Sequence, residues 1–411
     1  MIQILIMKQK VINDPVHGFI SISDKLIFNI IEHPYFQRLK RIKQLGLTYL
    51  VYPGAHHTRF HHALGAYHLM KKAINVLQNK GVKITKGEAL AAQLAILLHD
   101  IGHGPFSHTL EHILIKGTSH EKISLLYMQK LNEEFNGQLD LAIKIFTNQY
   151  HKKFLYQLVS GQLDVDRLDY LTRDSYFTGV SEGVINYNRI IDMIDVFDNE
   201  LVVESKGIYS VEKFLVSRRI MYWQVYLHKT VISAEQMLVK VVQRAQELAK
   251  KDTDISTRTM MDFFLNEKSQ DKNSDNFLLN FSKLDDIDVL ASLKVWSNHN
   301  DKILSFLSNS LLNRKLFKIK IQNEDFKPKA IAEIRDKLIA KLNVSESEVS
   351  YLMPYKSITS YLYHPDHAKI KILFKNNKVL DFIDASDQWN TLTVEKAVTK
   401  HYVCFPKQML D

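Results

Sequence analysis

Residues 95–108 read AILLHDIGHGPFSH and place an imidazole beside a carboxylate at the end of an apolar helical run. Four apolar residues lead directly into His99 and Asp100, and His103 and His108 follow among two glycines and a proline. Burying such polar groups costs free energy unless they are paired. A metal ion would pair them, and imidazole with carboxylate suits zinc, iron, manganese or nickel. The stretch therefore predicts a metal site whose other ligands come from elsewhere in the chain.

The remaining ligands must come from helices that fold against this one. Two adjacent histidines open an upstream helical pattern, and the charged stretch at 163–170 carries three aspartates. The candidates are His61, His62, Asp164, Asp166 and Asp169. Spacing alone does not choose among them. Taken singly, each is more typical of a core histidine or of a helix carboxylate that faces water or forms an i,i+4 ion pair. Their combination is what indicates a metal.

Composition describes a globular protein with ordinary chemistry. The chain has 411 residues, 45% of them hydrophobic and 24% charged, which is enough for a large core and two domains. The apolar run at the start is too short for a signal peptide or a membrane span. Cys404 is the only cysteine, so disulfides within the chain and cysteine-rich zinc sites are excluded. We expect a cytoplasmic protein without a membrane partner.

Charge and histidine placement narrow the class of ligand. The formal net charge of +9 suits nucleic acid or small polyphosphates, but the lysines are dispersed, and a solvated lysine-rich surface accounts for most of the charge. Of the 18 histidines, 12 lie at or before position 120. The site is therefore expected mainly in the N-terminal third.

Helical periodicity dominates from about residue 24 to residue 310. Pro34 divides residues 25–46 into two short helices. Residues 58–78 carry one apolar stripe, and Thr85 with Glu88 is a capping box that opens the helix ending at His99. Two more helices are expected at 163–174 and, long and bent, at 211–251, with a polar loop at 269–276.

The pattern changes after about residue 312. Residues 315–321 and 370–375 alternate like strands, residues 329–342 read as a helix, and residues 378–384 and 401–406 are further strand candidates. We therefore expect a mainly α protein with two parts, a helical core at 1–310 and a small α+β region at 311–411.

Five ordered motifs resemble a known family. NDPVHGFI, FQRLKRIKQLG, YPGAHHTRFHHALG, LLHDIGHGPFSH and DVDRLDYLTRD are similar to the HD-domain phosphohydrolases, in the branch of the SAM-and-HD-domain dNTP triphosphohydrolases. The resemblance covers about residues 10–250, with a weaker echo at 311–319. No SAM-domain pattern precedes the core, so a bacterial-type member is expected.

The resemblance implies a ligand set and catalytic groups. The family's metal motif falls on His62, His99, Asp100 and Asp166. Its metal is iron, zinc or manganese, with nickel as a further candidate and additional magnesium on the phosphates. The family's catalytic histidines match His103 and His120. The carboxylate that orients one of them falls on Glu111, where animal enzymes carry aspartate.

The resemblance also implies substrate contacts. The family's phosphate-contacting positions fall on Arg59, His108, Arg218, Tyr226 and Lys229. The positions of the last three also include contacts with the sugar. Deoxyribose and base contacts match Gln44, Leu45, Tyr170 and Asp174. Tyr222 stands where the animal enzymes have a histidine near the base.

A regulatory nucleotide site is implied less completely. In dNTP-activated relatives a guanine nucleotide binds between subunits, and Lys10 and Val11 match its lysine-valine pair. Glu32 stands at an aspartate position and Lys40 at an arginine position, and lysine lacks the fork of arginine.

The leading hypothesis is a metal-dependent nucleotide phosphohydrolase that converts a dNTP to deoxynucleoside and triphosphate. It would work as a homo-oligomer, a dimer or a tetramer, with a nucleotide activator. The alternatives are the same site acting on GDP, a signalling nucleotide or an oligonucleotide end, and a nucleic-acid-binding protein with a vestigial HD site.

Overall fold

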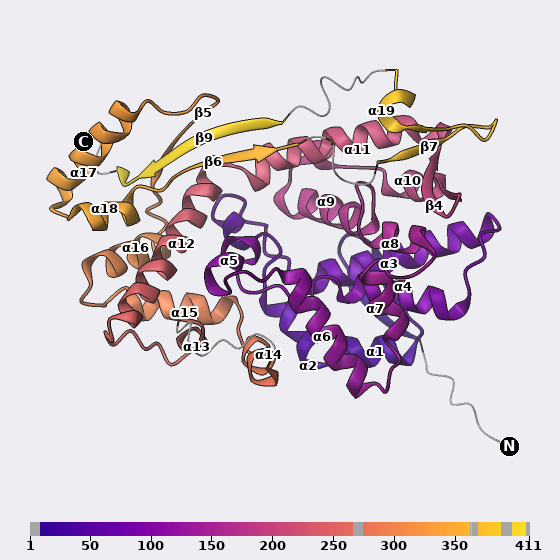
Figure 1. Cartoon of the computed structure of the whole chain (residues 1–411), viewed down its shortest axis with the longest axis horizontal. Helices are drawn as coiled ribbons and strands as arrows, with labels where there is room; N and C mark the ends of the chain where they lie inside the picture. Colours follow the sequence, from indigo (N-terminus) through magenta and orange to yellow (C-terminus); the bar gives the residue numbers. More distant parts are fainter. Residues whose placement is uncertain (1–8, 266–273, 362, 364–368, 388–396, 408–411) are drawn as a thin grey trace.

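The computed structural model describes residues 9–265, 274–361, 363, 369–387 and 397–407. Figure 1 shows a helical body, coloured indigo to magenta, with orange and yellow strands of the C-terminal region lying beside α11 and α12. The expected mainly α architecture with a small C-terminal α+β region is confirmed. Over the described ranges, no helix combines the length and the apolar character needed to cross a membrane.

The chain enters the fold through a hairpin and two short helices. Strands β1 (Lys10–Asp14) and β2 (Gly18–Ile22) pair antiparallel. Helix α1 (Lys25–Glu32) is capped by Asp24, and α2 (Pro34–Gln37) begins at Pro34, as expected for a residue that cannot continue a helix.

Three helices form the scaffold of the N-terminal core. They are α3 (Arg59–Asn79), α4 (Lys86–Leu98) and α9 (Val165–Thr178). The predicted apolar stripe of α3 is buried throughout, from Phe60 to Leu77. Thr85 and Glu88 form the capping box of α4, and His99 is the C-cap residue, so the imidazole and carboxylate stand where the helix ends.

Shorter helices complete this core. They are α5 (Glu111–Leu114), α6 (His120–Glu134), α7 (Asp140–Phe146), α8 (Lys153–Val159) and α10 (Tyr187–Met193). The long helix expected at 211–251 is present but interrupted: α11 (Ile208–Met221) passes through a π-helical turn at Tyr222–Tyr226, and α12 (Lys229–Lys250) starts after His228. The bend places Tyr222 and Tyr226 at the junction between α11 and α12.

A hairpin inside the helical region departs from the sequence expectation. Strands β3 (Ile194–Phe197) and β4 (Glu200–Glu204) are joined at Asp198 and Asn199, both with positive φ. Strand β4 also pairs in parallel with β7 (Lys371–Leu373), which pairs with β8 (Val379–Asp381). Strand β3 has only four residues, and β4 also depends on a partner, β7, that lies far along the chain, so local periodicity carries little signal for either strand.

The end of the chain forms a second small sheet. Strand β9 (Val398–Phe405) lies between β5 (Lys318–Gln322) and β6 (Tyr355–Ser360), with α17 (Pro328–Leu342) and α18 (Glu346–Leu352) beside it. The strand expected at 378–384 stops at Asp381, because that side chain caps α19 (Phe382–Ala385).

The remaining helices connect the two regions. They are α13 (Met261–Leu265), α14 (Asp275–Phe281), α15 (Asp286–Trp296) and α16 (Lys302–Leu312). Most of the polar loop expected at 269–276 lies outside the described residues. One continuous apolar cluster runs from Ile20 through the helices to Ile372 and Tyr402. The C-terminal strands are therefore packed on the helical core.

Candidate active site

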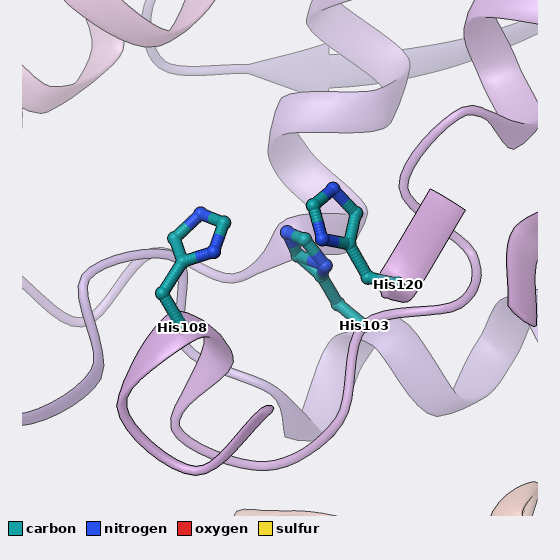
Figure 2. Close-up of side chains that lie close together, drawn as sticks. All are labelled: His103, His108 and His120. Carbon is teal, nitrogen blue, oxygen red and sulfur yellow. The ribbon is translucent and has the colours of Figure 1, made fainter. Parts of the chain in front are cut away.

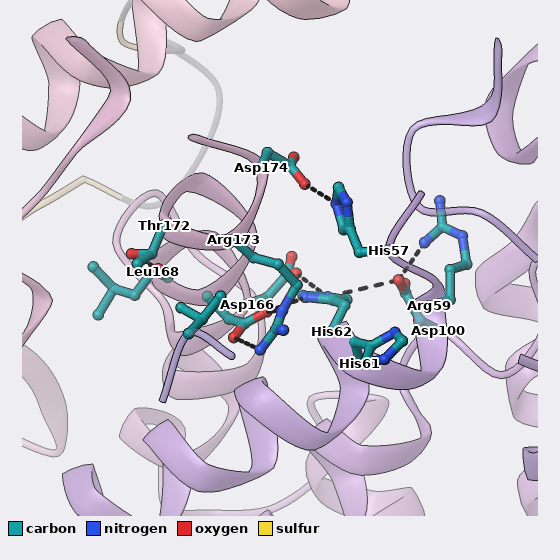
Figure 3. Close-up of polar contacts among 12 residues, drawn as sticks. His57, Arg59, His61, His62, Asp100, Asp166, Leu168, Thr172, Arg173 and Asp174 are labelled. Carbon is teal, nitrogen blue, oxygen red and sulfur yellow. Dashed lines mark hydrogen bonds and ion pairs between the residues drawn. The ribbon is translucent and has the colours of Figure 1, made fainter. Parts of the chain in front are cut away.

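Four side chains from three helices converge on one point. His62 lies in the first turns of α3, His99 and Asp100 follow α4, and Asp166 lies in the first turn of α9. Asp166 Oδ1 is 3.0 Å from His62 Nε2 and 3.4 Å from His99 Nε2, and Asp100 Oδ1 is 3.4 Å from His99 Nε2. Figure 3 shows His62 between Asp100 and Asp166. His62, His99 and Asp100 lie close enough together to hold a divalent metal ion, and with Asp166, which lies against both imidazoles, they form the His/Asp cluster.

The imidazole nitrogens fit a cation. The Nε2 atoms of His62 and His99 are buried and have no hydrogen-bond partner within the described part of the chain. Their other nitrogens are occupied: His62 Nδ1 donates to Asp169 Oδ2 at 2.7 Å, and His99 Nδ1 donates to the Ile96 carbonyl at 2.6 Å. Such contacts fix the tautomer that presents Nε2 as a ligand.

The neighbouring candidates have other partners. His61 Nδ1 lies 2.9 Å from Thr58 Oγ1 and serves the N-terminal cap of α3. Asp164 is the N-cap residue of α9, accepting from Arg167 N at 2.7 Å. Asp169 lies behind His62. The structure therefore brings His62 and Asp166, and not these three residues, to the centre.

Electrostatics at the centre favour an added positive charge. Burial alone would lower the pKa of His62, but contacts with Asp166 and Asp169 raise it to about 10. Burial would likewise raise the pKa of Asp166, yet His62 and His99 hold it well below its ordinary range. Asp100 forms an ion pair with Arg59. A metal cation would supply the charge that a proton on His62 otherwise provides.

A large cavity opens beside the cluster. Its volume is about 1150 Å³, and its wall includes His99, Asp100 and Asp166. Most of the substrate contacts implied by the sequence also line it: Gln44, Leu45, Arg59, His108, Tyr170, Asp174, Tyr222 and Tyr226. Residues from four separated segments of the chain thus share one pocket.

Two of the implied contacts do not reach the pocket wall. Lys229 is exposed at the start of α12 and is not among the lining residues described for the cavity. Arg218 is buried behind the wall, close enough to Tyr170 to influence its hydroxyl, and its Nη1 has no hydrogen-bond partner among the described residues.

Three imidazoles form a second cluster in the same cavity (Figure 2). The ring centroids of His103 and His120 are 3.8 Å apart, and that of His108 lies 5.0 Å and 5.3 Å from them. Burial, with Arg59 as the next cause, lowers the pKa of His103 well below its ordinary value. Burial and the neighbouring positive charge therefore both favour the neutral form of the His103 ring.

Glu111 holds two of these imidazoles. Its Oε1 accepts from His120 Nδ1 at 2.8 Å, and its Oε2 accepts from His108 Nδ1 at 3.1 Å. Burial would raise the pKa of Glu111, but the two histidines hold it below its ordinary range. The carboxylate that replaces a shorter aspartate thus contacts both rings.

The opposite side of the pocket is built from tyrosines and Asp174. Asp174 Oδ1 accepts from His57 Nε2 at 2.7 Å, and its Oδ2 accepts from the Tyr226 hydroxyl at 2.7 Å. The Tyr226 ring lies 5.2 Å from the Tyr222 ring and 6.3 Å from the Tyr170 ring. Gln44 Oε1 is buried and lacks a hydrogen-bond partner in the described ranges.

Sequence reasoning missed several polar residues of the wall. Arg167 lines the cavity next to Asp166 and donates to the Gly161 carbonyl at 2.7 Å. The only signal for it in the sequence is its position beside a candidate ligand. Glu235 on α12 and Lys356 on β6 line the same cavity. Burial raises the pKa of Glu235 to about 7. No local pattern marks these two, since the C-terminal sheet brings Lys356 there.

The implied regulatory residues lie on the surface. Lys10 and Val11 are exposed on β1, and Glu32 and Lys40 are exposed near the ends of α1 and α2. Lys40 Nζ is 4.6 Å from the centroid of the Phe60 ring. The four residues do not belong to the wall described for the cavity.

Comparison with protein families gives two matches. Residues 59–200 match the HD domain, and residues 185–277 match the HD associated region. The first match begins at Arg59 and contains all four residues of the His/Asp cluster.

Two of the similar proteins match nearly the full length of this chain, and a third matches part of it. The Bacillus subtilis protein YwfO, described as uncharacterized, is 31% identical over 98% of this chain and 93% of its own length. Human deoxynucleoside triphosphate triphosphohydrolase SAMHD1 is 31% identical over 60% of this chain and 46% of its own length. The crystal structure of a phosphohydrolase from Bacteroides thetaiotaomicron matches with a TM-score of 0.93 and 50% identity, covering 97% of this chain and 100% of that one. The chain belongs to the HD-domain phosphohydrolase family.

Proposed function

We propose that this protein is a metal-dependent phosphohydrolase that converts a dNTP to a deoxynucleoside and inorganic triphosphate. The observation that carries the proposal is the convergence of His62, His99, Asp100 and Asp166 beside a nucleotide-sized cavity, with two buried imidazole nitrogens that have no hydrogen-bond partner among the described residues. The similarity to SAMHD1, whose name states this activity, supports the choice of substrate class.

The four residues of the cluster would hold the metal. Iron, zinc or manganese suits two imidazoles and two carboxylates, with nickel as a further candidate. Such an ion would supply Lewis-acid chemistry, polarising a phosphoryl oxygen and lowering the pKa of bound water, and additional magnesium would bind on the phosphates. Asp169 and the Ile96 carbonyl orient the two ligating imidazoles.

Cationic side chains position the triphosphate. Arg59 projects into the cavity from its ion pair with Asp100, and Arg167 lies on the same wall. Phosphoryl transfer depends mainly on positioning and on charge placed where negative charge develops. His108, held by Glu111, contacts a phosphate from the far side.

His103 and His120 are the proton-transfer groups. Both line the cavity, and Glu111 fixes the His120 ring through Nδ1, which leaves Nε2 as the atom that can exchange a proton. A histidine so placed can protonate the leaving oxygen of the deoxyribose.

The tyrosine side of the pocket binds the nucleoside. Tyr170 packs under the sugar, and Tyr226 with Asp174 presents a polar edge to its hydroxyl. Gln44 and Leu45 contact the sugar and base, and Arg218 supports Tyr170 from behind. Tyr222 stands where the animal enzymes have a histidine near the base, so the part of the pocket that contacts the base differs. This difference motivates a second candidate: the same reaction centre acting on GDP, a signalling nucleotide or an oligonucleotide end.

The division of the chain and its assembly are also proposals. The helical core at 1–310 carries the chemistry, and residues 311–411 cover one end of the cavity through Lys356. A homo-oligomer would place Lys10, Val11, Glu32 and Lys40 at a subunit boundary that binds an activating nucleotide. The nucleic-acid-binding alternative predicts salt-sensitive binding of single strands that survives metal removal.

Product identification tests the proposal. The purified protein, with its metal content measured, is incubated with each dNTP, each NTP, GDP and a short oligonucleotide, and the products are separated and identified. We expect deoxynucleoside and triphosphate in equal amounts. Release of pyrophosphate or orthophosphate alone would contradict the bond assignment, and turnover of only GDP or of oligonucleotide would establish the second candidate.

A further inference from the structure

The N-terminal hairpin is joined to the metal centre by buried ion pairs. Arg173 on α9 donates from Nη1 to Asp14 Oδ2 at 2.8 Å and from Nη2 to Asp14 Oδ1 at 3.2 Å. The same guanidinium donates from Nε to Asp169 Oδ2 and from Nη2 to Asp169 Oδ1, both at 3.0 Å. Asp169 Oδ2 in turn accepts from His62 Nδ1 at 2.7 Å. Two residues, Arg173 and Asp169, therefore separate Asp14 of the hairpin from the proposed metal ligand His62.

The hairpin makes a second connection through His17. His17 Nε2 lies 2.7 Å from Asp169 Oδ1, and both side chains are fully buried. Asp14 builds the turn that places this ring, since its Oδ1 accepts from the backbone of Val16 at 3.0 Å and of His17 at 2.8 Å. One aspartate thus both shapes the turn and pairs with Arg173.

Helix α3 is shaped to admit this network. Gly65 lies one turn after His62, and a Cβ atom there would stand 1.9 Å from Asp169 Oδ1 and 2.3 Å from Arg173 Nη2. A side chain at position 65 would push the carboxylate away from His62. The His62–Asp169 hydrogen bond therefore requires a residue without a side chain at position 65, where α3 approaches α9 closely.

We propose that Asp169 is the positioning residue for His62, and that the hairpin Lys10–Ile22 sets the metal affinity of the centre through Asp14, His17 and Arg173. This inference rests on the metal site proposed above. A carboxylate on the distal nitrogen fixes the imidazole tautomer and increases its basicity as a ligand.

Charge balance gives the direction of the effect. Arg173 divides its donors between Asp14 and Asp169. When Asp14 loses its charge, Arg173 is drawn more strongly to Asp169, and its Nε competes with His62 Nδ1 for the same oxygen, Oδ2. The hydrogen bond from His62 Nδ1 to Asp169 then weakens, and the His62 imidazole binds the metal less tightly. Because Lys10 and Val11 belong to the same hairpin, a ligand that moves β1 would reach the metal by this route.

Zinc affinity of the full chain tests the inference. Zn²⁺ is titrated into metal-free protein in competition with a chromophoric chelator. Asp169→Asn should weaken zinc binding by about 10–100-fold. Asp14→Asn should weaken zinc binding about threefold to tenfold through Arg173, and His17→Phe should do the same because Asp169 Oδ1 loses the ring that holds this carboxylate in position. Asn13→Ala, an exposed change in the same hairpin, is the matched control and should bind zinc as the wild type does.

Two further measurements separate positioning from folding. Arg173→Lys keeps the charge but loses the two-point contact that holds Asp169 in place against His62, so it should weaken zinc binding too. This variant keeps the inference testable even where Asp169→Asn does not fold. Long-range ¹H–¹⁵N spectra of the zinc-loaded protein should show His62 with its proton on Nδ1 in the wild type and an altered signal in Asp14→Asn.

The outcomes distinguish this inference from the proposed function. Zinc affinities equal to wild type in the folded Asp14, His17 and Arg173 variants, with an unchanged His62 signal, would overturn the coupling and leave the metal site standing. A wild-type protein that binds no zinc, and behaves as His62→Ala does, would overturn the metal site itself.

Discussion

Glu111 accepts from His120 twice: its Oε1 lies 2.8 Å from the imidazole Nδ1 and 2.7 Å from the backbone nitrogen of the same residue. His120 opens helix α6, so the carboxylate also complements the positive end of that helix. The position and the orientation of the His120 ring are therefore determined together by one side chain.

Replacing Glu111 by glutamine tests this relationship. The amide cannot accept from His120 and His108 at once, because one of its two ends is a donor. We expect kcat to fall about 10-fold to 100-fold, a fraction of what general acid–base catalysis contributes. Metal content, measured on the same preparation, should stay at the wild-type level, because Glu111 is outside the His/Asp cluster. Unchanged turnover would remove Glu111 from the mechanism.

The adjacent residues His61 and His62 provide a matched pair for the metal site. His62→Ala should lose both bound metal and activity, since it removes one of the four proposed ligands. His61→Ala removes only the cap contact with Thr58, so it should keep the metal and lose about 1 kcal/mol of stability. Metal analysis and thermal unfolding check both. Equal metal loss in the two variants would contradict the assignment of His62.

Arg167 and Lys229 provide a similar pair for substrate binding. Arg167 lines the cavity, whereas Lys229 is exposed and lies outside its described wall. Arg167→Ala should lower kcat/KM for a dNTP by about 10-fold to 100-fold, equivalent to about 1.4–2.8 kcal/mol of transition-state stabilisation. Lys229→Ala should change it less than about twofold. Steady-state kinetics measure kcat/KM for both variants. A larger loss in Lys229→Ala than in Arg167→Ala would show that Lys229 contacts the phosphates in the complex.

Glu235 predicts a pH dependence of stability. Burial raises the pKa of Glu235 from an ordinary 4.5 to about 7 in the folded state. The contribution of the protonated carboxyl to the free energy of unfolding is therefore fully present below pH 4.5 and is lost as the pH rises through about 7. The neutral variant Glu235→Gln has no such loss. Between pH 5 and pH 8 it should gain about 2 kcal/mol on the wild type, less than the full value because the carboxyl is only partly buried. Urea unfolding across this range measures the difference, and a pH-independent difference would contradict the shift.

Local patterns account for the parts of the fold that depend on neighbouring residues. The apolar stripe of α3, the capping box at Thr85 and the break at Pro34 are all where periodicity and backbone chemistry predict them. The β3–β4 hairpin was missed because its strands are only four and five residues long, and the pairing of β4 with β7 was not predictable because those two strands are distant in sequence.

The sequence by itself determined which chemical groups are available and which helices end or begin with them: an imidazole and a carboxylate after α4, two histidines at the start of α3, aspartates at the start of α9. Only the tertiary structure decided their roles. Successive helix residues point about 100° apart, so His62 faces the centre while His61 caps its own helix. Asp166 and Asp169, one turn apart, meet opposite nitrogens of the same His62 ring. Whether a carboxylate lies at the centre or supports a ligand from behind depends on how α3 and α9 pack, and that packing is set by the whole core.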